Sequence, residues 1–259
     1  MLRKFTTICG IISALLLFSP VRAGENSFSH VDHMQLGIPQ DPDLLISRRG
    51  FALGYSYRYR QALWVSYILT ADNVRAKRVP RSNKFNADPE VRITPVTPAE
   101  YTRSGYDRGH LAPAADMGYS RQTMLNSFLM SNISPQKPGC NREIWKHLEK
   151  QIRLWALQER KIYIVTGPVF NTSPQYIPAT NLPVPQAFYK VVLDLTPPYK
   201  MAAFIVPNSS SDKEISAFAV SVDEVEKVTG MDFFNALPDD LENTLEKQSA
   251  FDQWMKKPQ

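Results

Sequence analysis

Residues 106–117 read Tyr-Asp-Arg-Gly-His-Leu-Ala-Pro-Ala-Ala-Asp-Met, and this stretch says more about fold and chemistry than any other part of the chain. It places an acid, a permanent cation and an imidazole side by side, at Asp107, Arg108 and His110. An imidazole titrates near ~6.5 and can accept a proton at neutral pH, and a planar guanidinium suits a phosphate group. The alternative is a surface ion pair between Asp107 and Arg108 beside a packed His110. Four residues alone do not decide between these interpretations.

A second stretch, residues 141–149, reads Asn-Arg-Glu-Ile-Trp-Lys-His-Leu-Glu and opens a predicted helix. The helix is indicated by apolar residues at helical spacing: Ile144, Trp145, Leu148, Ile152 and Trp155. Mg²⁺ prefers oxygen ligands, and the neutral amide of Asn141 would hold the ion without cancelling its charge. Glu149 lies about two helical turns further on and could orient the water shell of the ion. Alternatively, Asn141 is only the helix N-cap, and Glu149 pairs with Lys146 or Arg153.

Around these stretches the sequence predicts a sheet. Runs of apolar, β-branched and aromatic residues indicate strands at 44–57 (a strand or hairpin), 62–70, 126–131, 161–167, 187–194 and 201–206. Residues 71–104 contain four prolines and no sustained period, which predicts a long surface loop. The connection between the last two strands is short enough for an antiparallel pair.

Helices are expected between and after these strands. Ser221 and Glu224 form a capping box, and Gly230 supplies the end of the helix that follows. A last helix is expected from Leu241 to Trp254. The predicted class is therefore α+β, with a mainly antiparallel sheet and flanking helices.

The first 23 residues have the organisation of a secretory signal peptide. They comprise a basic start, an apolar run from Phe5 to Phe18 and a small-residue end at Ala23. The apolar run is too short to span a membrane. We therefore expect an exported protein, periplasmic or secreted, that is cleaved near Ala23 and has no stable membrane association. Residues 24–259 are expected to form a single domain.

Net charge and cysteine content give little information about function once the predicted signal peptide (the leader, residues 1–23) is removed. The whole chain has a formal charge of +5, but loss of the leader leaves 27 basic and 25 acidic residues, a charge of +2. Cys9 leaves with the leader, so Cys140 has no partner for an intramolecular disulfide. Acidic residues gather in the C-terminal part of the chain, at Asp223, Glu224, Glu226, Asp232, Asp239, Asp240, Glu242 and Glu246. Composition leaves open whether this is a solvated face or a far side that repels a polyanion.

Three blocks together resemble the sugar-non-specific DNA/RNA endonuclease family, which includes endonuclease G. The blocks are residues 106–117, residues 131–136 (Ser-Asn-Ile-Ser-Pro-Gln) and residues 141–149, and their spacing also fits. Weaker matches extend the resemblance over most of residues 28–255. The resemblance implies a ββα-metal (His-Me finger) active-site motif within a larger antiparallel α+β domain. It also favours the functional interpretations of His110 and Asn141 over the structural ones.

At matching positions, the resemblance implies roles for three residues of the centre. His110 would be the general base, Asn141 the direct Mg²⁺ ligand, and Glu149 a catalytic group that holds the metal through water. Mn²⁺ would be a possible substitute for Mg²⁺.

The resemblance also implies contacts to the substrate. Arg108 would bind the phosphate and stabilise charge there, and Asn132 and Gln136 would bind substrate in the same site. An upstream catalytic arginine is implied as well, for which Arg81 is the first candidate and Arg78 the second.

The implied activity is hydrolysis of phosphodiester bonds in DNA and RNA to 5′-phosphate products, and the resemblance makes a homodimer plausible. The chain contains no evident base-reading helix or zinc finger, so broad substrate choice is expected, because phosphate contacts carry little sequence information. Two other functions stay open. One is a non-catalytic protein of the same fold that binds nucleic acid or another polyanion. The other is a phosphodiesterase that acts on a non-nucleic-acid ester.

Overall fold

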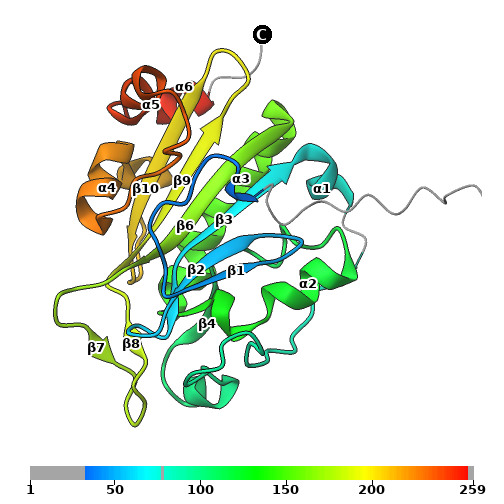
Figure 1. Cartoon of the computed structure of the whole chain (residues 1–259), viewed down its shortest axis with the longest axis vertical. Coiled ribbons are helices and arrows are strands. Elements are labelled where there is room, and N and C mark those ends of the chain that lie inside the picture. The colour runs from blue at the N-terminus through cyan, green and yellow to red at the C-terminus, as the bar shows by residue number, and fades with distance from the viewer. Residues whose placement is uncertain (1–32, 77–78, 256–259) are drawn as a thin grey trace, which may run out of the picture.

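The structure is a computed structural model that describes residues 33–76 and 79–255 of the 259-residue chain (Figure 1). The predicted signal peptide with its cleavage position and the candidate Arg78 lie outside the described residues.

A seven-stranded sheet forms the centre of the molecule, with the strand order β1-β2-β3-β6-β9-β10-β11. Its strands are β1 (Leu44–Ser47), β2 (Ala52–Ser56), β3 (Gln61–Thr70), β6 (Lys161–Val169), β9 (Ala187–Asp194), β10 (Lys200–Pro207) and β11 (Ala219–Val220). Every neighbouring pair in it is antiparallel. The predicted α+β class with a mainly antiparallel sheet is confirmed, including the hairpin within 44–57.

Apolar cores cover both faces of this sheet. This explains why alternate residues of its central strands, which point to opposite faces, are both apolar. On one face, the long helix α3 (Trp145–Glu159) packs Leu148 and Ile152 against the sheet. On the other face, α4 (Val222–Thr229) and the segment after it contribute Val225 and Phe233. The sheet is therefore the middle layer, and α3 and α4 lie on opposite sides of it.

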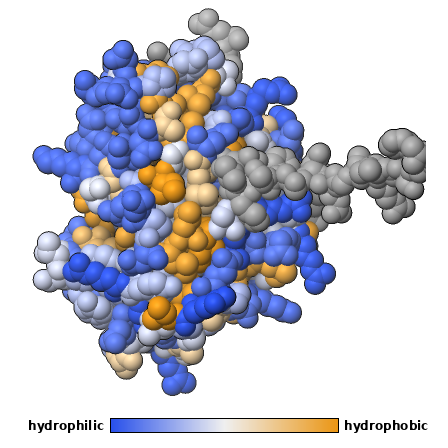
Figure 2. Space-filling view, viewed as in Figure 1, coloured by the Kyte–Doolittle hydropathy of each residue, from blue (hydrophilic) through white to orange (hydrophobic). Residues whose placement is uncertain are grey.

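The C-terminal segment was predicted as one helix but forms two, α5 (Asp239–Glu246) and α6 (Phe251–Met255). Leu245 of α5 packs with the α4 face, whereas Trp254 of α6 packs with the α3 face, 4.9 Å from the ring of Trp155. One straight helix cannot reach both faces of a sheet, so the chain must break between them. Helices α4 and α5 lie beside β10 at one end of the sheet (Figure 1), where hydrophilic residues cover the surface (Figure 2).

The strand predicted at residues 126–131 is also wrong. Helix α2 (Arg121–Ser127) occupies its first half, and the 3₁₀ turn η3 (Met130–Asn132) follows. The Ser120 hydroxyl accepts a hydrogen bond from the Thr123 N–H and caps the helix. The run of apolar residues therefore reflects burial of helix and turn side chains rather than a strand, which begins only at Ile133.

The long loop predicted at residues 71–104 carries two short elements, α1 (Ala71–Ala76) and the 3₁₀ turn η2 (Pro98–Tyr101). Its centre is anchored at the buried Asp88, which accepts two hydrogen bonds of 2.6 Å from Arg48. A second small hairpin, β7 (Gln175–Tyr176) with β8 (Pro183–Val184), extends from the lower end of the molecule in Figure 1, where Val184 packs with Val96 and Tyr101 of the loop. In the described part of the chain, no helix has both the length and the apolar character needed to cross a bilayer.

Candidate active site

Two strands and one helix place the predicted catalytic residues in a single unit. Strand β4 (Asp107–His110) pairs antiparallel with β5 (Ile133–Gln136), and His110 lies opposite Ile133. The chain then enters a π-helical turn, η4 (Cys140–Ile144), which continues into α3. The unit is a ββα motif that carries His110 on the first strand and Asn141 at the start of the helix.

His110 is buried, with its imidazole between two aromatic rings. The ring centroids of Phe85 and Phe128 lie 5.5 and 4.7 Å from that of His110. Its Nε2 has no hydrogen-bond partner among the described residues. Burial lowers the pKa of His110 to about 3, and the positive charge of Arg81 adds to this effect. The imidazole is therefore neutral at neutral pH and able to accept a proton.

Asn141 is oriented by a carboxylate on the facing strand. Its Nδ2 donates to Asp107 Oδ2 over 2.9 Å, which leaves the amide oxygen Oδ1 for another partner. Arg142 donates two hydrogen bonds to the same carboxylate, at 2.8 and 2.7 Å. Burial alone would raise the pKa of Asp107, but the hydrogen bonds from Arg142 and Asn141 outweigh it and lower the pKa. Asp107 therefore stays charged and keeps the amide in place.

The alternative that Asn141 is only an N-cap is wrong. The helical conformation begins before it, and its backbone N–H already donates to the Lys137 carbonyl. Its side chain caps nothing and reaches across to β4 instead. Single π-helical turns within α-helices frequently occur at functional sites.

Glu149 lies two turns along α3 and forms no hydrogen bond or ion pair with any described side chain. The expected alternative partner Arg153 donates to Asp116 over 2.8 Å instead. Burial raises the pKa of Glu149 to about 7, while the nearby charge of Lys190 opposes this rise. The carboxylate is thus not committed to another side chain, and burial disfavours its charged form.

Lys190 is fully buried at the centre of β9, on the side that faces α3. Its Nζ lies 4.7 Å from the centroid of the Trp145 ring and has no hydrogen-bond partner in the described structure. Burial lowers the pKa of Lys190 to about 8, and Glu149 acts in the opposite direction. Burying a cation without a hydrogen bond costs free energy. The electrostatic attraction between Lys190 and Glu149 offsets part of this cost.

His110, Asn141 and Glu149 all line one cleft of about 500 Å³. Its other lining residues include Arg81, Lys146 and Arg153. The exposed Arg81 stacks its guanidinium over the Phe128 ring at 5.4 Å. The cleft therefore combines a neutral imidazole, two uncommitted oxygen ligands and several cations. This is a donor set that suits a hard divalent ion beside an anionic substrate.

Arg108 does not line this cleft. Its Nη2 donates to the Pro98 carbonyl over 2.8 Å, and its Cζ lies 5.3 Å from the centroid of the Phe85 ring. Because Arg108 and His110 are two residues apart on a strand, they share one face, and Phe85 contacts both. The position of Arg108 supports a role in bracing Phe85 against His110, and its contact to phosphate stays a prediction.

Asn132 and Gln136, which were predicted to bind substrate, lie in or next to the ββα unit, and neither side chain has exposed surface. Asn132 donates from Nδ2 to the carbonyls of Ala112 and Ser127, and its Oδ1 accepts from the Ala112 N–H. It therefore fixes the backbone that follows His110.

Gln136 packs over Gly109. A Cβ atom at Gly109 would lie 2.1 Å from Gln136 Oε1, so a glycine is required there by a close side-chain contact.

The sequence interpretation missed three contributors to the site: Arg153, Asp116 and Lys190. Asp116 closes the 106–117 block and holds Arg153 at the cleft, while Tyr67 donates to its other oxygen over 3.0 Å. A usable signal existed for Lys190, since it is a single cation in the middle of an otherwise apolar strand.

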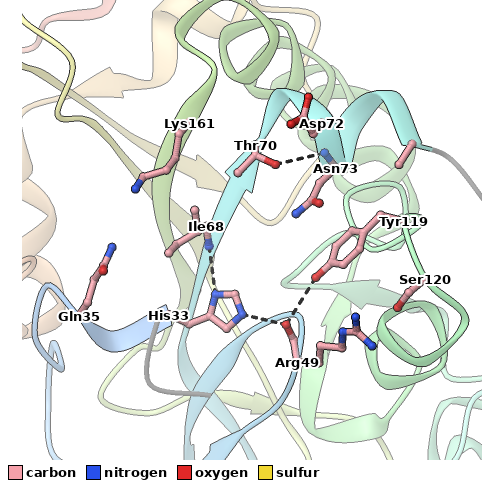
Figure 3. A pocket seen from close by; sticks show the side chains of 11 residues that line it. His33, Gln35, Arg49, Ile68, Thr70, Asp72, Asn73, Tyr119, Ser120 and Lys161 are labelled. Carbon is pink, nitrogen blue, oxygen red and sulfur yellow. Dashed lines mark hydrogen bonds between the residues drawn. The ribbon is translucent and has the colours of Figure 1, made fainter. Parts of the chain in front are cut away.

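A second cleft of about 460 Å³ lies away from this unit, between the N-terminal segment, β3 and α1 (Figure 3). His33 there accepts a hydrogen bond at Nδ1 from the Ile68 N–H, and its Nε2 contacts the Arg49 carbonyl at 3.1 Å. Tyr119 points its hydroxyl to the same carbonyl (Figure 3). Both ring nitrogens of His33 contact the main chain, which marks it as a structural histidine.

The fold and the site together define the class of ββα-metal nucleases. The family described as DNA/RNA non-specific endonuclease matches residues 29–240, and the chain belongs to this family. It is a nuclease family, and its members are of a metal-dependent type.

Individual relatives agree with this assignment. A nuclease of Syncephalastrum racemosum is 35% identical over 85% of this chain and 77% of its own length. A nuclease of Serratia marcescens is 31% identical over 91% of this chain and 92% of its own, and the human mitochondrial endonuclease G is 32% identical over 73% and 69%. A crystal structure of an EndoG/EndoGI complex, which concerns EndoG inhibition, contains a chain that superposes with a TM-score of 0.76. It is 30% identical and covers 83% of this chain and 95% of its own.

We expect the change Arg81→Met to raise the pKa of His110, because it removes a positive charge that disfavours the imidazolium. The pKa should stay below the ordinary value of ~6.5, since burial is the larger cause of the shift. Imidazole chemical shifts, followed by NMR during a pH titration of the metal-free protein, would measure it. Lys146→Met is the matched control: it removes a cation from the same cleft that does not contribute to the shift. Equal pKa values of His110 in the wild type and in Arg81→Met would contradict the assignment.

Proposed function

We propose that this chain is an exported, Mg²⁺-dependent endonuclease that hydrolyses phosphodiester bonds of DNA and RNA and leaves 5′-phosphate ends. One observation carries the proposal. His110, whose buried imidazole is neutral, lines the same cleft as Asn141 and Glu149, whose oxygens are uncommitted. A base that is neutral at working pH is thereby combined with ligands for a hard cation.

The proposed reaction uses His110 as the general base. The neutral imidazole of His110 accepts a proton from the attacking water, while Phe85 and Phe128 fix the plane of the ring. The water oxygen forms a bond to phosphorus as the bond to the 3′-oxygen breaks. The 3′-oxygen leaves and takes up a proton, and the phosphate stays on the 5′ side.

The charged side chains of the cleft stabilise the phosphate during this step. Arg81 lies exposed above Phe128 and provides a fixed positive charge next to the base, and Arg153 is held at the cleft by Asp116. A divalent cation held by Asn141 and, through water, by Glu149 would supply further stabilisation of the developing negative charge. Mn²⁺ has the same preference for oxygen ligands and is expected to replace Mg²⁺.

Broad substrate choice follows from the kind of contacts available. The groups that line the cleft are cations, amides and carboxylates that address a phosphate, which is common to DNA and RNA. Binding is expected to weaken steeply with salt concentration, because phosphate contacts release counterions.

The change His110→Ala should lower the rate of plasmid cleavage by at least ~10²–10⁴-fold, the usual contribution of a general base. A plasmid-nicking assay in Mg²⁺, repeated in EDTA and with labelled 5′ ends, measures rate, metal dependence and product chemistry together. An unchanged rate in this variant would end the assignment of His110. Absence of any cleavage by the wild type would favour a binding protein. Cleavage of small diesters but not of plasmid would favour a phosphodiesterase of another ester.

The change Asn141→Ala should raise the Mg²⁺ concentration needed for half-maximal activity by about ten-fold or more, because the direct oxygen ligand is lost. The matched control is Glu143→Ala, which removes an exposed side chain of the same turn that does not line the cleft. Isothermal titration with Mn²⁺ gives a second readout that does not depend on turnover. Wild-type metal binding by Asn141→Ala would reduce Asn141 to a structural residue.

Export is proposed from residues 1–23, which carry the organisation of a signal peptide. We expect the mature protein, expressed from the full-length gene, to begin at or near residue 24. N-terminal sequencing of the protein recovered from the periplasm and from the medium tests this and separates the two locations. A mature chain that still begins at Met1 would contradict the proposal.

A further inference from the structure

Five carboxylates converge between α4 and α5, on the face of the sheet opposite to the catalytic helix. Two of them, Asp223 and Glu226, lie one turn apart on α4, and two others, Glu242 and Glu246, lie one turn apart on α5. Asp232 joins them from the segment between the helices.

These residues form two groups that share one member. Asp223, Glu226 and Glu246 make up the first group, and Asp232, Glu242 and Glu246 make up the second. Within each group, one carboxylate oxygen from every residue lies within 4.8 Å of the others. We call the five residues the α4–α5 cluster.

The shared residue is also buried and unsatisfied. Glu246 exposes only 7% of its surface, and its Oε1 has no hydrogen-bond partner in the described structure. The Oε1 of Glu242 is in the same state. Among the described residues, no lysine, arginine or histidine forms an ion pair with any carboxylate of the cluster. Buried carboxylate oxygens normally have a partner, so these point to a ligand.

Apolar packing brings the acidic groups together against their mutual repulsion. Val225, Phe233 and Leu245 belong to one core that joins both helices to the sheet. Burial, followed by the neighbouring carboxylates, raises the pKa of Glu246 to about 8 and that of Glu242 to about 7. Without a bound cation, the charged forms of these carboxyl groups are therefore disfavoured.

We propose that the α4–α5 cluster is a second cation site, which takes Ca²⁺ and has Glu246 at its centre. The ligands are all carboxylate oxygens, which excludes the nitrogen and sulfur sets typical of zinc. They come from two helices and the segment between them, and this irregular arrangement fits the flexible six to eight oxygen ligands of Ca²⁺ better than the strict octahedron of Mg²⁺. The Phe233 N–H donates to Glu226 Oε1 over 2.9 Å, and a side-chain interaction with Glu246 brings the Glu226 carboxyl group into the cluster.

Such a site would act on stability rather than on catalysis. A bound ion would link α5 to α4, and both helices contact β10. The cluster shares no residue with the cleft that contains His110 and Asn141, and it lies across the sheet from α3.

The test uses the full mature chain with Asn141→Ala, so that a response of the active site does not contribute. Calcium-free protein is titrated with Ca²⁺ by calorimetry, and its thermal unfolding is followed with and without the ion. We expect saturable binding. The unfolding midpoint should rise by about 5–10 °C when free Ca²⁺ is about 100 times its dissociation constant. The same concentration of Mg²⁺ should give a clearly smaller rise.

Two variants in the same background decide where the ion binds. Glu242→Gln with Glu246→Gln should abolish the Ca²⁺ response and, without Ca²⁺, should unfold at the parent temperature or above it, because repulsion is removed. Asp240→Asn, a change in an exposed first-turn acid of α5 outside both groups, should keep the full response. If the double variant does not fold, Asp232→Asn replaces it and should weaken Ca²⁺ binding at least tenfold.

The proposal is overturned by any of three results. One is the absence of Ca²⁺ binding and of a shift in the parent protein. Another is a full response in the variant that lacks cluster carboxylates. The third is an equal rise in the unfolding midpoint with Mg²⁺, which would contradict the assignment of the site to Ca²⁺.

Discussion

The active site depends on one hydrogen bond, from Asn141 Nδ2 to the carboxylate of Asp107. It connects the strand that ends in His110 with the helix that carries Glu149, and it turns the amide so that its oxygen is free. Arg142 donates to the same carboxylate and keeps it charged. This one contact joins the strand to the helix and so fixes the relative positions of His110, the Asn141 oxygen and Glu149. Electrostatic catalysis requires such preorganisation.

Beneath this contact lies a second constraint, the burial of charge under α3. Glu149 and Lys190 have opposite charges, and each opposes the effect of burial on the other. Arg153 and Asp116 form a direct ion pair next to them. Removing one member of such a set leaves a buried charge without compensation, which costs more than the set contributes when it is whole. The apolar core and the reactive groups on α3 are therefore linked through the same helix.

Much of the architecture could be predicted from local sequence. The long strands could be predicted because the residues on both of their faces are apolar. The capping box of α4 could be predicted because its residues interact within one helical turn. Residues 126–131 were misassigned because a helix and a 3₁₀ turn that bury their apolar side chains resemble a strand in composition. The division between α5 and α6 could not be found either, since it results from packing on opposite faces of the sheet.

The same limit applies to the site. His110, Asn141 and Glu149 could be selected by motif and spacing, and the structure brings all three to one cleft. The positions of Asn132, Gln136 and Arg108 could not be foreseen, because a polar side chain in a motif can be directed either to the substrate or to the backbone. Only the fold decides which. The last helix has a consequence of another kind: Trp254 packs against Trp155 and completes the core beneath α3. The catalytic helix therefore reaches its full packing only after α6 has been synthesised, so the order of translation itself places assembly of the site after synthesis of α6.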